Sequence, residues 1–172
     1  MPIQSGSRFP YPDFKKRYDT ERQEPVVWRW AELAQDLGSA DHPERGTLAL
    51  SLPDGSAEIV RDTAVAYQVV PAEGRTTAHA HSWYHLFVVR SGTGTVVFEP
   101  AGERTELNPG DIMLVPAWSL HRFENPGAQG DLVLLNLMNI PLLSQLGNLF
   151  SEQGADQLPD QLPDRGESAR AA

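Results

Sequence analysis

The sequence contains no cysteine among its 172 residues, which excludes disulfides and any metal site built on thiolate sulfur. No apolar run approaches the ~18 residues that a membrane-spanning helix needs, so no membrane association is expected. Basic residues are also scarce, 14 against 23 acidic ones, and the net charge of −9 argues against a nucleic-acid partner. The first residues lack the basic and apolar regions of a secretory signal, which together with the absence of cysteine predicts a cytoplasmic location.

The composition divides the chain into three parts. Residues 1–24 are polar and rich in proline and basic residues, and we interpret them as an extended N-terminal arm. Residues 25–150 carry the apolar periodicity of one folded domain. Residues 151–172 include a tandem Gln-Leu-Pro-Asp repeat and have no face to bury, which predicts a disordered acidic tail.

Two short helices are predicted near the ends of the folded domain. Four apolar side chains recur at the spacing of one helical face over 28–38, and a second helix over 141–147 has proline at its start. The first face consists of Trp30, Leu33, Ala34 and Leu37.

Between these helices the hydrophobic period changes from that of a helix to that of a strand. Short runs of β-branched and aromatic residues recur, separated by glycine, proline and asparagine. The expected strands lie near 47–52, 57–61, 65–70, 84–90, 93–99, 104–107, 112–115, 120–124 and 132–138. We therefore predict an all-β fold, a jelly-roll β-barrel or sandwich with short N- and C-terminal helices.

Four of the five histidines gather in two short segments. His79 and His81 are two residues apart, a spacing that places both imidazoles on one face of a strand. His85 has the same parity, and His121 follows about 40 residues after His81. Neutral imidazole is the commonest metal ligand in proteins, so these four residues predict a site for one divalent metal ion. The fifth, His42, is interpreted as a solvated loop residue.

The two histidine segments resemble the two sequence motifs of the cupin superfamily. The first motif is matched by Gly74, His79, His81 and Gly92, with His85 in the place of the usual acidic residue and a gap after Gly74 that is one residue short. The second motif is matched by Gly110, Pro116, His121 and Asn125, with Trp118 in the place of glycine. The resemblance implies a cupin-type jelly roll.

Over roughly residues 25–150 the chain is more specifically similar to the gentisate 1,2-dioxygenase type of cupin enzyme. The local matches are Val26–Trp30, Gln68–Pro71, Pro116–Trp118, and Pro141–Leu143 with Leu146–Gly147. Those relatives usually carry two cupin domains per chain, so the resemblance implies that this single domain forms a homodimer.

The resemblance implies a non-haem oxygenase for a small hydroxylated aromatic or related metabolite. His79, His81 and His121 would hold Fe(II), with His85 as a fourth ligand or as a catalytic base facing the substrate. His85 also makes the chain similar to four-histidine cupin polyketide cyclases, so a zinc-dependent cyclase or isomerase is the second hypothesis. A non-catalytic small-molecule-binding cupin is the third. Imidazole ligands alone do not distinguish Fe from Zn.

Overall fold

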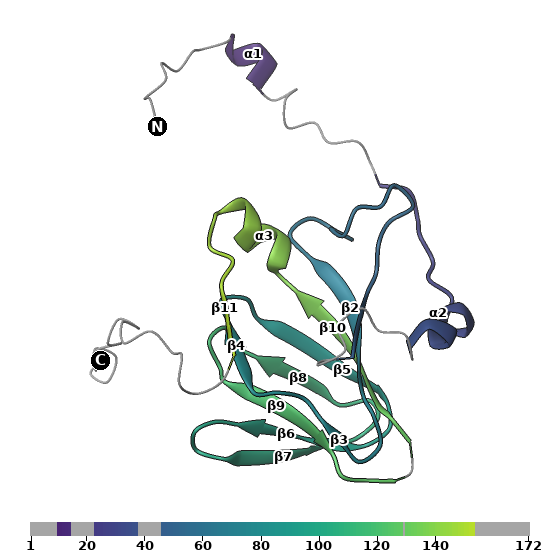
Figure 1. Cartoon of the computed structure of the whole chain (residues 1–172). Helices are drawn as coiled ribbons and strands as arrows, with labels where there is room; N and C mark the ends of the chain where they lie inside the picture. The colour runs from purple at the N-terminus through teal and green to yellow at the C-terminus, as the bar shows by residue number, and fades with distance from the viewer. Residues whose placement is uncertain (1–9, 15–22, 38–45, 129, 154–172) are drawn as a thin grey trace, which may run out of the picture.

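The computed structural model describes residues 10–14, 23–37, 46–128 and 130–153. Two antiparallel β-sheets face each other (Figure 1), and the described part of the chain also contains three short helices. The helices are α1 (Tyr11–Phe14), α2 (Trp30–Asp36) and α3 (Ile140–Gln145). The prediction of an all-β sandwich with short helices near its ends is therefore confirmed. No helix in the described part of the chain is long and apolar enough to cross a bilayer.

The first sheet has five strands in the order β1-β2-β10-β5-β8. Its strands are β1 (Thr47–Ala49), β2 (Ala64–Val70), β10 (Leu132–Met138), β5 (His85–Ser91) and β8 (Ile112–Val115). The second sheet follows the order β11-β4-β9-β6-β7, with β3 paired to β9 beside this path. Its strands are β11 (Ser151–Gln153), β4 (His79–His81), β9 (His121–Asn125), β6 (Gly94–Phe98), β7 (Glu103–Leu107) and β3 (Gly74–Arg75).

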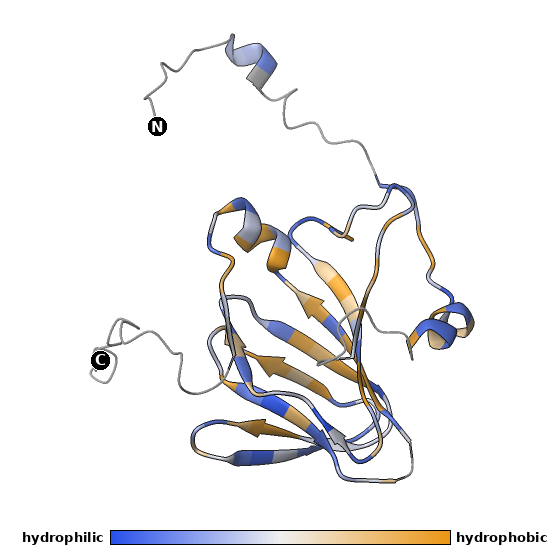
Figure 2. Cartoon of the chain, in the orientation of Figure 1, coloured by the Kyte–Doolittle hydropathy of each residue, from blue (hydrophilic) through white to orange (hydrophobic). Residues whose placement is uncertain are grey.

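The core lies between the sheets, where apolar side chains from both inner faces meet. The ring centroids of Phe87 on β5 and Phe123 on β9 lie 5.1 Å apart, edge to face, which is a favourable aromatic geometry. The other members of the core cluster are Val70, Val89, Val96, Leu107, Val115, Leu132 and Leu134. Figure 2 shows the hydrophobic colour concentrated on β5, β8 and β10, whereas β7 is largely hydrophilic. This apolar packing supplies the domain with a hydrophobic core.

The predicted helix over 28–38 is observed as α2, and its expected apolar face partly contacts the sheet. The Trp30 ring lies 5.4 Å from the ring of Tyr67 on β2, and the guanidinium of Arg90 lies 4.5 Å above Trp30. Leu33 is partly buried, whereas Ala34 is exposed. The helix therefore rests on the outer surface of the five-stranded sheet, mainly through Trp30.

The prediction of a strand over 57–61 is wrong. This segment is irregular, and its only ladder contact is an isolated bridge between Val60 and Thr63. Asp62 has a φ of 66°, in the left-handed region, and its amide donates to the Glu58 carboxylate at 2.6 Å. A tight turn closed by a local side chain thus replaces the ladder that the alternating pattern had suggested.

The predicted start of the disordered tail, residue 151, falls at a residue that the structure places in a strand. Ser151–Gln153 form β11, which pairs with β4 so that Ser151 lies opposite His81. The sequence of this strand carries no apolar alternation that would have predicted it. The strand is recognised by its pairing with the backbone of β4. Residues 154–172 lie outside the described residues, as do His42 and residues 1–9 and 15–22 of the predicted arm.

Candidate metal centre

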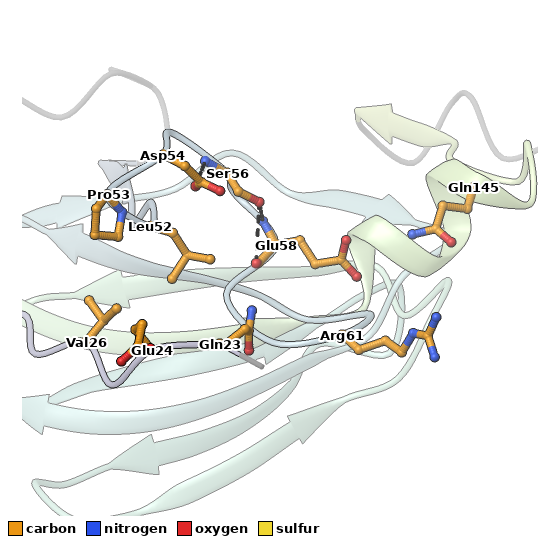
Figure 3. A pocket seen from close by; sticks show the side chains of 10 residues that line it. All are labelled: Gln23, Glu24, Val26, Leu52, Pro53, Asp54, Ser56, Glu58, Arg61 and Gln145. Atoms are coloured by element: carbon orange, nitrogen blue, oxygen red, sulfur yellow. Dashed lines mark hydrogen bonds between the residues drawn. The ribbon is translucent and has the colours of Figure 1, made fainter. Parts of the chain in front are cut away.

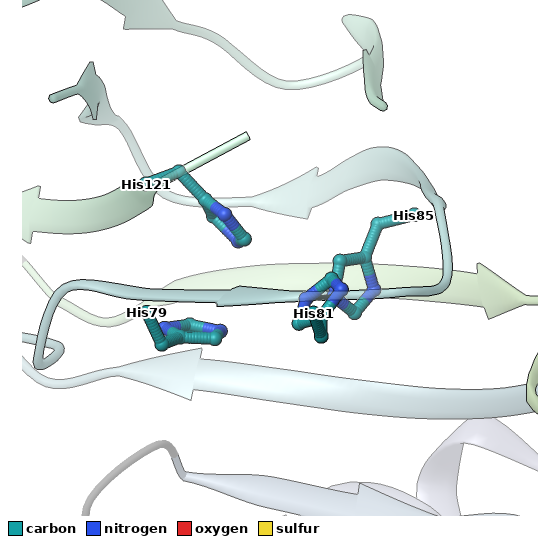
Figure 4. A group of neighbouring side chains, drawn as sticks. All are labelled: His79, His81, His85 and His121. Atoms are coloured by element: carbon teal, nitrogen blue, oxygen red, sulfur yellow. Dashed lines mark hydrogen bonds between the residues drawn. The ribbon is translucent and has the colours of Figure 1, made fainter. Parts of the chain in front are cut away.

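Three strands bring the four predicted histidines to one end of the sandwich interior. His79 and His81 lie on β4, His85 begins β5, and His121 begins β9 opposite His79. All four side chains are buried, and one nitrogen from each lies within 4.8 Å of the others. Figure 4 shows the four imidazoles converging on a common space between these strands. The structure therefore brings together every residue of the predicted site.

Backbone carbonyls orient three of the four rings. The Nδ1 atom of His79 lies 2.9 Å from the carbonyl oxygen of Thr77. The Nδ1 atom of His81 lies 2.7 Å from the carbonyl oxygen of Trp83. The Nδ1 atom of His121 lies 2.8 Å from the carbonyl oxygen of Ser119. A carbonyl oxygen only accepts hydrogen bonds, so each Nδ1 carries the hydrogen. The lone pair of each ring is consequently on Nε2, the tautomer that a metal ion requires at that atom.

The ring of His85 is oriented by a side chain. Its Nδ1 lies 2.8 Å from Oδ1 of Asn136, and its Nε2 lies 2.7 Å from Nε2 of His81. With both Nδ1 atoms protonated, two lone pairs face each other at this short distance. That arrangement is favourable when a cation shares both lone pairs.

The surroundings of His85 oppose its protonation. Burial, followed by the neighbouring imidazoles of His81 and His121, lowers the pKa of His85 from 6.5 to about 2. The hydrogen bond to Asn136 acts in the opposite direction but is outweighed. At neutral pH His85 is thus an uncharged imidazole, which is the form that ligates metals.

The metal-free protein is expected to lose stability as the pH falls below 6.5. Between pH 6.5 and about 2 the unfolded chain binds a proton at His85 that the folded chain does not bind. The free energy of unfolding should therefore decrease by up to about 1.4 kcal/mol per pH unit in this window. Urea unfolding of the metal-free protein at pH 7.5, 6.5 and 5.5 measures this slope. A His85→Gln variant should show a shallower slope, and equal slopes would contradict the assignment.

The donor set fits a divalent transition metal. Two ligands on opposite sides of an ion, each at about 2.1 Å, are about 4.2 Å apart, close to the 4.8 Å limit of the cluster. Four neutral imidazoles suit Fe, Zn, Cu or Ni rather than Ca²⁺ or Mg²⁺, which prefer oxygen ligands.

Two tryptophans contact His81, one at its ring and one at its backbone carbonyl. The Trp83 indole stacks on this imidazole with centroids 3.9 Å apart and an interplanar angle of 7°. The Trp118 amide donates to His81 O at 2.7 Å. Trp118 has a φ of 62°, a left-handed conformation that costs a non-glycine residue on the order of 1–2 kcal/mol. This cost accounts for the glycine that the cupin motif has at that position, because glycine adopts positive φ without a side-chain penalty.

Asn136 completes the site, and its hydrogen bond with His85 could not be predicted from the sequence. It is the only polar residue of β10, Leu-Val-Leu-Leu-Asn-Leu-Met, and it is 3% exposed. A single amide within an otherwise apolar strand was the available signal, because a buried carboxamide requires a hydrogen-bond partner. The identity of that partner depends on the register between β10 and β5, which the sequence does not reveal.

A separate hollow of about 880 Å³ lies on the surface near α3 (Figure 3). Its lining comes from the segment around Gln23–Val26, the loop between β1 and β2, and Gln145 of α3. None of the four histidines lines it. The metal-ligating side chains gather in the buried histidine cluster, so we do not assign a function to this surface hollow.

Comparison with known proteins agrees with this geometry. Residues 66–138 match the Cupin domain family. The 5-aminosalicylate 1,2-dioxygenase of Comamonas sp is 33% identical over 150 residues, covering 81% of this chain and 40% of that protein. The gentisate 1,2-dioxygenase of Streptomyces sp is 31% identical over 156 residues, covering 85% and 43% respectively. The chain thus spans about two fifths of the length of these curated relatives.

A solved salicylate 1,2-dioxygenase from Pseudaminobacter salicylatoxidans shares the fold. It superposes with a TM-score of 0.70 at 23% identity, over 89% of this chain and 44% of that chain. The matched family region includes all four histidines and Asn136. The chain therefore carries a cupin domain and is similar in sequence to the gentisate 1,2-dioxygenase type of cupin enzyme.

Proposed function

We propose that the protein is a metal-dependent dioxygenase that opens the ring of a small hydroxylated aromatic acid with O₂. The supporting observation is the convergence of four buried imidazoles, His79, His81, His85 and His121, inside a cupin domain. The dioxygenase names of the curated relatives support the choice of reaction and substrate class.

The four imidazoles would hold one divalent ion, with Fe(II) favoured. Such an ion supplies O₂ activation and a positive charge that orients an ionised substrate hydroxyl. The chain contributes ligand geometry, through the Nδ1 hydrogen bonds that aim each Nε2 inward. It also contributes an apolar surface next to the cluster. The ring centroid of Phe87 lies 4.8 Å from that of His85, and the ring centroid of Phe123 lies 5.9 Å from that of His121. Excluding water there strengthens the electrostatic interactions within the site.

We assign His85 the role of a fourth ligand in preference to that of a base. Its Nδ1 is occupied by Asn136 and its Nε2 faces His81. A pKa lowered to about 2 makes this imidazole a poor proton acceptor near neutral pH. The low proton affinity does not impair coordination, since the ligand form is the neutral one.

The second candidate function is a zinc-dependent cyclase or isomerase, and the fourth histidine is the observation that favours it. Four neutral ligands leave the full dipositive charge on the ion, which suits polarising a carbonyl or enolate. They also leave only two positions on an octahedral ion, which suffice for O₂ and a substrate bound through one atom but not for O₂ and a bidentate substrate. This candidate predicts zinc in the purified protein and no consumption of O₂.

Metal analysis and oxygen uptake distinguish these functions. Protein purified without a histidine tag and without added metal should contain close to one equivalent of iron. With gentisate, 5-aminosalicylate or salicylate it should consume one O₂ per molecule of aromatic acid converted. One equivalent of zinc without O₂ consumption would support the cyclase instead. Tight binding of these acids without any conversion would support a non-catalytic binding protein.

We further propose that the protein acts as a cytoplasmic homodimer. The edge strand β8 presents Ile112 and Leu114 to solvent, 69% and 58% exposed, on the outer face of the five-stranded sheet. Exposed apolar residues on an open sheet edge are consistent with a partner surface. Sedimentation equilibrium should give a mass near twice 19.0 kDa, and a monomer mass would contradict the dimer.

A further inference from the structure

The four imidazoles differ in what orients them. For His79, His81 and His121 the acceptor of the Nδ1 hydrogen is a backbone carbonyl only two residues away along the chain. These three hydrogen bonds follow from the local course of the backbone, because each acceptor is a main-chain atom. His85 is the exception, because its acceptor is the Asn136 side chain, 51 residues away.

Sheet register brings Asn136 to this position. On β10, Met138 lies opposite His85 and Asn136 lies opposite Phe87. Residues of equal parity share a face of the sheet, so the side chains of Asn136 and His85 both point into the sandwich and are diagonal neighbours. Phe87 stacks against the His85 ring with centroids 4.8 Å apart. The ring is thus held between an aromatic face and one hydrogen-bond acceptor.

We propose that Asn136 is a positioning residue that makes His85 the fourth metal ligand. This inference rests on the metal site of the proposed function. By accepting the Nδ1 hydrogen, Oδ1 of Asn136 keeps the Nε2 lone pair of His85 directed at the same point as the other three. Hydrogen bonding at the distal nitrogen also raises the basicity of a ligating imidazole. A single side chain on β10 therefore decides between a four-histidine and a three-histidine centre, and hence how many positions remain for substrate.

The test compares Asn136→Leu, which removes the acceptor at similar size, with Asn136→Asp, which retains it. We measure metal affinity by chelator competition and count the coordinated imidazoles by X-ray absorption of the cobalt-loaded proteins. Asn136→Leu should bind metal 10- to 100-fold more weakly and show three imidazoles instead of four. Asn136→Asp should retain four imidazoles with affinity equal to or higher than that of the wild type. Should Asn136→Leu not fold, Asn136→Ala carries the same expectation.

Gln68→Leu is the matched control. Gln68 is another buried carboxamide on the same inner face, on β2, and it makes no hydrogen bond to a histidine among the described residues. This variant should retain four imidazoles and wild-type affinity. An equal loss in Gln68→Leu would assign the effect to interior polarity and overturn the proposal.

A double variant separates positioning from general structural damage. If Asn136 acts through His85, adding Asn136→Leu to His85→Ala should not weaken metal binding further. Four imidazoles and unchanged affinity in Asn136→Leu would refute the inference, as would three imidazoles in the wild-type protein, while the metal site itself would stand. A wild-type protein that binds no metal would instead refute the proposed function.

Discussion

Replacing His121 with alanine is expected to reduce bound metal from about one equivalent to below about a tenth of an equivalent. Zinc-finger peptides bind zinc through four ligands with about 10–16 kcal/mol, and by that scale one ligand contributes roughly 3 kcal/mol. Losing it should lower metal affinity by about two orders of magnitude. Oxygen uptake should fall with the metal content. Elemental analysis after gel filtration and oxygen-electrode assays measure the two effects.

The fold should persist in this variant because the apolar core is built without the histidines. The ring of His121 lies 5.9 Å from that of Phe123, but the core cluster extends beyond this contact through apolar residues of β5, β6 and β10. His42→Ala is the matched control, since His42 is the one histidine of the sequence that we do not assign to the site. Unchanged metal content in His121→Ala, or equal loss in His42→Ala, would refute the assignment of the site.

Deleting residues 148–172 is expected to lower the melting temperature markedly and to weaken metal binding, whereas deleting 154–172 should change neither. The longer deletion removes β11, which pairs along the whole of β4. On its other side β4 has a single registered pair with β9, His79 with His121. The strand that carries two of the four ligands therefore depends on the C-terminal segment for its position.

Ser82 shows how this segment is attached. Its amide donates to Phe150 O at 2.9 Å, its hydroxyl donates to Asn148 O at 2.7 Å, and Phe150 N donates to the same hydroxyl at 2.9 Å. Three hydrogen bonds at about 1 kcal/mol each amount to about 3 kcal/mol. For a domain of this size that corresponds to a loss of roughly 6–12 °C in melting temperature.

Differential scanning calorimetry and chelator competition on both truncated proteins measure these expectations. The 154–172 deletion serves as the control for removing the acidic repeat, and it tests our proposal that the folded domain extends to residue 153. Equal melting temperatures for the two deletions would show that β11 does not stabilise β4. A large loss from the shorter deletion would show that residues beyond 153 stabilise the domain.

Some strands of the fold could be predicted from the sequence, and others could not. Strands such as β2, β5 and β10 carry dense runs of β-branched and aromatic residues, and their existence follows from composition alone. β4 and β11 do not carry such runs, and each is recognisable only through its partner strand. The segment over 57–61 shows the converse error, since a left-handed residue at Asp62 ends the alternation before a ladder forms.

The sequence by itself determined that imidazoles gather here, because His79 and His81 share a face on any strand and His121 closes the second cupin motif. Only the tertiary structure decided how His85 takes part. Its ring orientation depends on the register of β10 against β5, and its low pKa depends on burial among the other imidazoles. Both are long-range properties, since residues 85 and 136 meet only when the sheet assembles. A local pattern can specify which face a side chain occupies, but not which side chain it meets across the sheet.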